Sequence, residues 1–214
     1  MNRVFHSVLL MAVVGYLASG IASADRLVTI PTGDTLTTGG IRAEVQSRFD
    51  ASKGQSYWVN LGLPHIEIEG ARFQDYNGRS DDSLSIQASV LPETMFSPGI
   101  SLGLRDVADN TRNSNMPYQG RAAYLAVSKS IPLTGGIPLL LHDVKVHGGV
   151  GTGSLKGLFF GAEGTLPLGL RAKAEYDSSR MNFEAAYFIV PKVKVDAALI
   201  KGDMYYGGAF STAF

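Results

Sequence analysis

The sequence contains no cysteine in its 214 residues. Disulfide bonds and thiol chemistry are therefore excluded, and so is a lipid anchor that begins on a cysteine. An excess of one charge is also missing, because 19 Lys and Arg residues balance 19 Asp and Glu residues. This balance gives no indication of a nucleic-acid partner or of a polybasic contact with a membrane.

Long apolar runs are missing after the first 24 residues. The longest apolar runs there are short, such as IPLLL (137–141). A helix needs about 20 apolar residues to cross a bilayer. The glycine-rich stretch GGVGTG (148–153) lacks the lysine and the following helix of a phosphate-binding loop. No His, Asp and Glu residues have metal-ligand spacing on one face. The sequence therefore predicts no transmembrane helix, no cofactor and no metal site.

Residues 1–24 have the features of an export signal. MNRVFHS supplies a short start with one basic residue, Arg3, and VLLMAVVGYLASGI supplies an apolar stretch. Ala22-Ser23-Ala24 then gives the small-x-small pattern of a signal-peptidase site, so we predict export and cleavage after Ala24. The alternative is a helix that stays as a membrane anchor, for which the apolar stretch is short.

From Ile41 onward, apolar and polar residues alternate, which is typical of strands with two different faces. In IRAEVQSRF (41–49) the odd positions are mostly apolar and the even positions polar, and LRAKAEY (170–176) and VKVDAAL (193–199) also alternate. This pattern indicates an all-β chain. We predict twelve strands, at 41–50, 55–63, 65–75, 82–91, 98–107, 118–130, 139–151, 155–166, 169–177, 181–190, 192–201 and 204–214.

The turns between these strands are of two kinds. Every second turn contains proline, at Pro64, Pro92, Pro132, Pro167 and Pro191. The intervening turns are polar and rich in Gly, Asn, Asp and Ser, and the longest spans 107–118. An up-and-down meander places alternate turns at opposite ends of a sheet, so one end is compact and the other hydrophilic. This asymmetry is typical of membrane barrels with short periplasmic turns and longer outer loops.

Soluble β-sandwiches and lipocalin-like barrels also alternate, with their apolar face inside. Here the polar face carries paired charges on many strands, and the strands have about the 9–11 residues that a tilted strand needs to cross the hydrocarbon. An unbroken meander of twelve strands also leaves no second sheet. We therefore predict a single antiparallel, up-and-down transmembrane β-barrel over residues 41–214, located in the outer membrane and surrounded by its lipid.

The final strand ends YYGGAFSTAF, with Phe210 and Phe214 on one parity. A terminal phenylalanine on an alternating strand resembles the signal read by the machinery that inserts outer-membrane barrels. We predict that this machinery is a partner, and that the last strand pairs with the first, since lipid offers no partner for free backbone groups.

The polar parity predicts which side chains line the lumen. Charges of both signs on neighbouring strands either pair as structural ladders or line a selective polar channel. Residues 25–40, rich in Thr and Gly, either lie inside the barrel as a plug or form a lead on the periplasmic side. The predicted lining residues are Arg42, Glu44, Arg48, Glu67, Glu69, Lys145, Arg171, Lys173, Glu175, Glu184, Lys194 and Asp196.

Catalysis has little support in the sequence. His65 lies in a predicted turn, and His142 and His147 differ by five positions, which places them on opposite faces of one strand. His147 with Ser154 and Asp177 is a conceivable triad that no spacing requires. We predict that the protein is not an enzyme, and a hydrolase at the outer face is the weakest alternative.

The segments SLSIQASVLPETMFSPGISLGLRDVADN (83–110), AAYLAVSKSI (122–131) and IPTGDTLTTGG (30–40) resemble the YjbH-like family of outer-membrane barrels associated with exopolysaccharide production. Family members linked to exopolysaccharide operons are typically much longer, and lipid anchoring occurs among them, whereas this chain is short and lacks cysteine. The resemblance implies an envelope location and a shared signature that is structural rather than ligand-binding. The signature residues are Gly103, Arg105, Asp106, Tyr124, Ser128 and Lys129.

Three functions follow as hypotheses. The first is an outer-membrane barrel that serves exopolysaccharide export or envelope assembly, with polysaccharide or export components as partners. The second is a small passive porin for polar solutes. The third, from a different class, is a barrel hydrolase.

Overall fold

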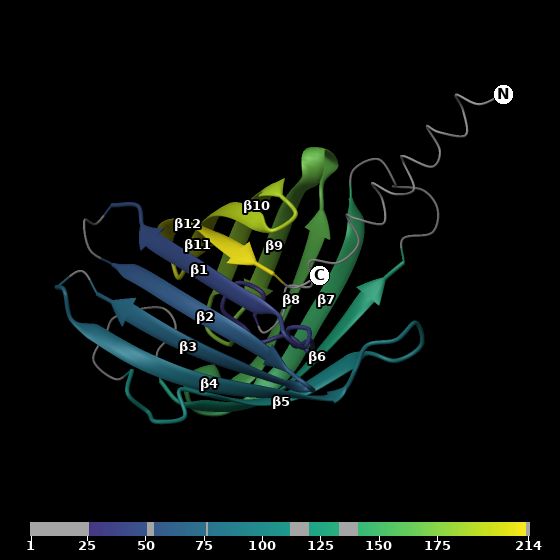
Figure 1. The fold of residues 1–214 in the computed structure, drawn as a ribbon, viewed down its shortest axis with the longest axis horizontal. Coiled ribbons are helices and arrows are strands. Elements are labelled where there is room, and N and C mark those ends of the chain that lie inside the picture. Colours follow the sequence, from purple (N-terminus) through teal and green to yellow (C-terminus); the bar gives the residue numbers. More distant parts are fainter. Residues whose placement is uncertain (1–25, 51–53, 76, 112–119, 133–140, 213–214) are drawn as a thin grey trace.

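The computed structural model describes residues 26–50, 54–75, 77–111, 120–132 and 141–212. Its strands form one closed antiparallel barrel in which each strand pairs with its neighbours in sequence (Figure 1). The predicted all-β meander of twelve strands is therefore confirmed. The strands are β1 (Ile41–Arg48), β2 (Gln55–Leu63), β3 (Ile66–Gln74), β4 (Ser80–Leu91), β5 (Gly99–Arg105), β6 (Ala122–Ile131), β7 (His142–Gly151), β8 (Gly157–Thr165), β9 (Leu170–Tyr176), β10 (Met181–Val190), β11 (Val193–Ile200) and β12 (Asp203–Ser211).

The barrel closes between its first and last strands, as the sequence predicted. β1 pairs antiparallel with β12 from Arg42 opposite Ser211 to Arg48 opposite Tyr205, and Phe210 lies opposite Ala43. Closure gives every strand two neighbours, so no sheet edge is left with unpaired backbone groups. Phe214 lies outside the described residues.

Alternation of burial shows which face points inward. Along β1 the polar side chains of Arg42, Glu44 and Gln46 are buried, whereas the apolar residues between them are exposed. The same outward exposure is seen for large apolar side chains around the barrel, such as Val59, Leu158 and Ile189, which are 56%, 70% and 59% exposed. The exterior is therefore apolar and the interior polar, which is the reverse of a soluble sandwich or lipocalin-like barrel.

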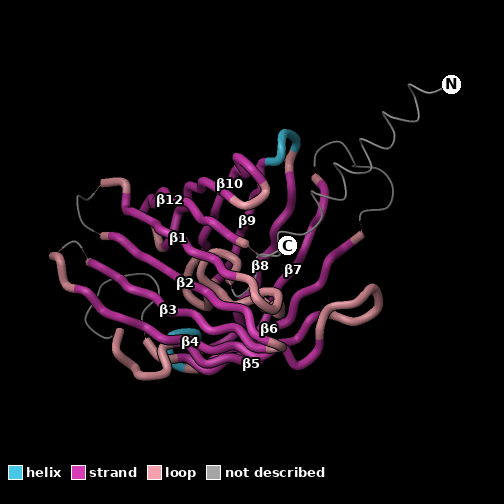
Figure 2. The backbone as a smooth tube through the Cα atoms, in the orientation of Figure 1, coloured by secondary structure: helices cyan, strands magenta, loops and turns pink. Residues whose placement is uncertain are grey.

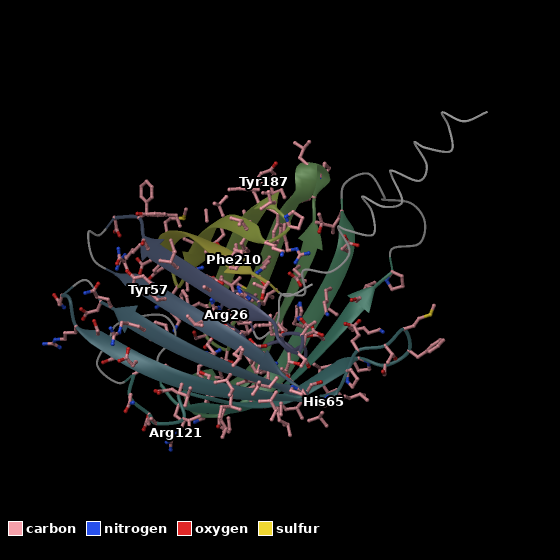
Figure 3. All side chains as sticks on the ribbon, viewed as in Figure 1. Arg26, Tyr57, His65, Arg121, Tyr187 and Phe210 are labelled. Carbon is pink, nitrogen blue, oxygen red and sulfur yellow. The ribbon has the colours of Figure 1, made fainter. Side chains whose placement is uncertain are left out.

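The two kinds of turn lie at opposite ends of the barrel. The five proline-containing connections follow the even-numbered strands β2 to β10, and the polar loops follow the odd-numbered strands. In Figure 3, His65 in the β2–β3 turn and Arg121 before β6 lie at these two ends. Two short 3-10 helices, Gly153–Leu155 and Pro167–Gly169, sit in the connections. Within the described residues no helix has the length and apolar character needed to cross a membrane.

Some strand ends differ from the sequence prediction. The strand expected at 118–130 is Ala122–Ile131, and the one expected at 98–107 ends at Arg105. It ends there because Asp106 adopts a positive φ of 47° and its carboxylate accepts hydrogen bonds from the backbone of Asn110 and Thr111. The side chain of Asp106 thus starts the long polar loop.

We expect Gly103→Ala to destabilise the barrel by about 1–3 kcal/mol through overpacking. A Cβ atom at Gly103 would lie 2.2 Å from the hydroxyl of Tyr124, whose ring covers this glycine from the neighbouring strand. The hydroxyl is also held by Gln87 at 2.8 Å. Urea unfolding, followed by fluorescence of the single tryptophan, measures the effect. Gly70→Ala is the matched control, because nothing lies within 4 Å of its Cβ position; equal stability of the two variants would contradict the expectation.

Candidate functional site

Residues 26–36, which we call the inner segment, lie inside the barrel. Figure 2 shows this loop within the ring of strands, and its side chains Leu27, Val28, Ile30 and Leu36 are at most 3% exposed. The segment turns back on itself, since the N–H of Leu27 donates to the carbonyl of Ile30 at 2.8 Å. The side chains of Leu27, Val28 and Ile30 join an internal cluster with Trp58, Phe73 and Phe159. The lumen is thus occupied by the chain's own N-terminal part.

The carboxylate of Glu175 on β9 holds residues 28–30, which form the tip of the inner segment. It accepts the backbone N–H groups of Val28 and Thr29 at 2.8 Å each and that of Ile30 at 3.2 Å. It also accepts the Thr29 hydroxyl and, at 2.9 Å, the side-chain amide of Asn182. Successive N–H groups that converge on one anion form a nest, which favours negative charge there. Glu175 is therefore a polar anchor for three consecutive residues.

Cations of the wall and of the segment itself complete the attachment of the tip. Lys173 donates to the carbonyl of Leu27 at 2.9 Å, and Arg105 donates to that of Thr29 at 2.6 Å. The guanidinium of Arg26 reaches back to the wall, where it pairs with Glu44 at 3.0 Å and Glu69 at 2.9 Å. It also lies 4.1 Å from the centroid of the Trp58 ring, close enough for a cation–π contact.

The proline-turn end of the inner segment is attached separately. The N–H of Gly33 donates to the Ser128 hydroxyl at 2.7 Å, and that of Leu36 donates to Glu67 at 2.6 Å. Glycine is required at position 33, because a Cβ atom there would lie 2.4 Å from a wall carbonyl, that of Gly99. The segment therefore runs in direct contact with the inner surface of the sheet.

Lys145 links the inner segment to the β4–β5 turn. Its ammonium lies 2.6 Å from Asp34 and 2.8 Å from Glu93. Burial raises the pKa of Glu93, but the hydrogen bond and charge of Lys145 and the N–H of Ser130 outweigh burial, so this pKa lies below its ordinary value. Glu93 therefore stays ionised in mildly acidic solution and keeps Lys145 beside Asp34.

The remaining lumen charges pair with one another between β1 and β9–β11. Lys173 lies 3.0 Å from Glu184, and Lys194 lies 3.3 Å from both Glu184 and Asp196. Arg42 contacts Glu44 directly, and Lys194 approaches the same carboxylate at 3.9 Å. This network corresponds to the structural ladders that the sequence analysis gave as one interpretation.

All twelve lumen residues named from the sequence lie on the inner face or at its rim. Arg48 lies at the rim of the polar-loop end, where it pairs with Asp203 at 2.8 Å. The neutral polar side chains that bind the inner segment were missed, although they share the parity of the charged residues. These missed residues are Gln87, Ser101 and Asn182.

The signature residues named from the family resemblance make structural contacts. Tyr124 packs over Gly103. Arg105 and Ser128 form hydrogen bonds to the inner segment, and Asp106 organises the loop that follows β5. Lys129 donates to the carbonyls of Thr94 at 2.7 Å and Met95 at 3.0 Å, which orders the β4–β5 turn. That these residues are a signature shared with the YjbH-like family stays a prediction.

The histidine arrangement differs from the triad considered above. His147 Nδ1 lies 2.7 Å from the Ser128 hydroxyl, and Nε2 lies 3.6 Å from Glu163. Ser154 instead donates to the carbonyl of Gly120, and Asp177 caps the β9–β10 turn. Since the Gly33 N–H donates to the Ser128 hydroxyl, this site is covered by the inner segment. The side chain of His142 is outside the described residues.

Among the described residues, no three His, Asp or Glu side chains are grouped as metal ligands would be. A cavity of about 490 Å³ of space, partly open to solvent, remains between the inner segment and the β2–β6 wall. Its lining mixes charges of both signs with aromatic rings: Arg26, Arg105, Glu67, Glu69, Trp58, Phe73 and Tyr124.

The sequence matches no protein-family model, and comparison with curated proteins gives no match. A solved structure described as "KdgM porin in complex with disordered oligogalacturonate" is similar over 82% of this chain and 99% of that chain. The identity is 10% and the TM-score is 0.46. The resemblance to the YjbH-like family stays a prediction, and we infer function from the geometry of this chain.

We expect Glu175→Ala to loosen the inner segment. Counting only the two shortest of the three backbone N–H hydrogen bonds to Glu175, at about 1.5 kcal/mol each, their loss raises the released population about a hundredfold. Because the chain contains no cysteine, Ile30→Cys introduces a single site for thiol labelling. Ile30 is 0% exposed, so this site is protected as long as the inner segment stays in place. Maleimide labelling of Ile30→Cys should be slow, and fast when Glu175→Ala is added.

Asp82→Ala is the matched control for this labelling experiment. Its carboxylate is exposed and bonds to Arg72 on the wall, 2.7 Å away, at a site that the inner segment does not contact. Equal labelling rates with Glu175→Ala and Asp82→Ala would show that Glu175 does not retain the segment.

Proposed function

We propose that the protein is an outer-membrane β-barrel that conducts small polar solutes and is closed at rest by residues 26–36. The observation that carries the proposal is the inner segment itself, which fills a polar lumen through hydrogen bonds and ion pairs. These polar contacts can be exchanged for water or for a polar solute. Release also exposes the apolar side chains of Leu27, Val28 and Ile30, which favours the closed state at rest.

The outward apolar face supports a membrane location. Burying apolar surface is worth about 25 cal/mol per Å², so a barrel with this exterior gains stability from lipid and loses it in water. The closed ladder leaves no strand edge, which is the condition for a sheet within hydrocarbon. The export signal expected at 1–24 and the short proline turns opposite polar loops support the outer membrane and a periplasmic position of the proline end.

A role in exopolysaccharide export is a second proposal, which rests on the resemblance of residues 83–110 and 122–131 to the YjbH-like family. In this chain those residues form β4–β6 and hold the inner segment in place. Neighbouring genes for glycosyltransferases or polysaccharide export would favour it over a general solute channel. A hydrolase has less support, because Ser128, His147 and Glu163 lie beneath the segment.

The location is tested by cell fractionation combined with a gel-mobility assay. We expect the protein in the outer-membrane fraction, with different mobility before and after boiling, because a folded barrel resists unfolding by detergent. Recovery in the soluble periplasmic fraction, or one mobility under both conditions, would overturn the membrane assignment.

Conductance across planar bilayers tests the closed channel. We expect the refolded mature protein to be silent and a variant lacking residues 26–36 to form steady openings, because the deletion empties the lumen. Glu175→Ala, which keeps the whole segment, should open intermittently, and Asp82→Ala should remain silent. Each variant is first checked for heat-modifiable mobility. A steady open pore in the unaltered protein would contradict closure, and silence of folded deletion and Glu175→Ala variants would contradict conduction.

A further inference from the structure

A second cavity opens at the proline-turn end of the barrel and encloses about 450 Å³ of space, part of it open to solvent. Its walls come from the starts of β1, β9 and β11 and the ends of β10 and β12. The lining residues are Arg42, Arg171, Lys173, Ala186, Phe188, Pro191, Lys192, Lys194, Ala209 and Ser211.

Five of these ten residues are cationic and none is acidic. The carboxylates that pair with the cations lie behind the lining, as Glu184 does with Lys173 at 3.0 Å and with Lys194 at 3.3 Å. These pairs hold two ammonium groups at fixed positions on the cavity wall. The charged residues of the lining are therefore all cationic, even though the lumen as a whole contains both signs.

The outer part of the cavity has a different character. Arg171 lies 5.4 Å from the centroid of the Phe188 ring and 3.8 Å from Glu163, and its side chain is 17% exposed. Lys192 is exposed on the β10–β11 turn. Arg171 and Lys192 thus place two cationic heads on the more exposed part of the lining. Phe188 and Pro191 provide an apolar wall beside them.

We propose that this cavity binds a small organic polyanion with at least two carboxylate or phosphate groups. Its charged groups would meet Lys173 and Lys194 at the floor and Arg171 and Lys192 at the rim, while its carbon skeleton packs on Phe188 and Pro191. Charge-assisted hydrogen bonds of this kind are stronger than neutral ones. The site needs the folded barrel but not conduction, so it stands apart from the proposed channel activity.

Isothermal titration of the detergent-refolded mature protein with citrate at low salt tests the site. We expect measurable binding that weakens as salt rises, because the rim contacts are screened. Glucose, which is neutral, should not bind. Arg171→Gln combined with Lys192→Gln should weaken citrate binding about tenfold or more, since each loses a contact to a charged group.

Lys201→Gln is the matched control, because this exposed lysine lies on the β11–β12 turn at the opposite end of the barrel. It should bind citrate like the unaltered protein, and Arg171→Lys should retain more affinity than Arg171→Gln. Heat-modifiable mobility shows that each variant is folded. Failure of citrate and inorganic pyrophosphate to bind, or equal binding by the double variant and Lys201→Gln, would overturn the proposal.

Phospholipid phosphate is the other source of such an anion. Repeating the citrate titration in nanodiscs of phosphatidylcholine and of phosphatidylglycerol separates the two sources. Equal affinity in both lipids supports a soluble ligand. Binding that disappears in phosphatidylglycerol would assign the cavity to a lipid headgroup and overturn the soluble polyanion.

Discussion

Charge pairing inside a closed sheet is the constraint on which the rest of the structure depends. Closure of β1 onto β12 places one face of every strand in a narrow interior, where an ion without a partner is strongly disfavoured. Glu44 illustrates the solution, since Arg26, Arg42 and Lys194 all approach its carboxylate. One of these three cations comes from the inner segment. The inner segment is thus an integral part of the interior network of ion pairs.

The inner segment shows how irregular backbone is accommodated in such an interior. Its N–H and carbonyl groups cannot join a sheet ladder, so side chains of the wall serve as partners. Glu175 accepts N–H groups, and Lys173, Arg105 and Gln87 donate to carbonyls. Leu27, Val28 and Ile30 meanwhile fill the space around Trp58 and Phe159. Polar anchoring and apolar filling together explain a closed lumen in a barrel of twelve strands.

Much of the fold was predictable because strand alternation has one simple physical cause. In 41–48 the polar parity identified Arg42 and Glu44 as interior, and prolines at 64 and 191 located turns. Strand ends were less predictable: the last strand was expected to run to 214, whereas β12 ends at Ser211. At the end of β5 the limit is set by hydrogen bonding of the Asp106 side chain, which periodicity does not report.

The position of residues 25–40 was not fixed at the sequence level: a Thr- and Gly-rich stretch suits a plug or a lead, and partial insertion was the favoured interpretation. Its anchors are remote, as Val28 and Glu175 are separated by 147 positions. The pairing of Ser128 with His147 likewise depends on the β6–β7 register, which alternation alone does not fix. Contacts of this kind follow from three-dimensional closure and not from local pattern.

The order of the chain has a consequence for assembly. The inner segment is joined through residues 37–40 to β1, one of the two strands that form the seam, yet Glu175 and Asn182 belong to β9 and β10. The backbone N–H groups of residues 28–30 therefore find their carboxylate partner only when β9 is in place. Attachment of this part of the segment is consequently coupled to formation of the second half of the wall.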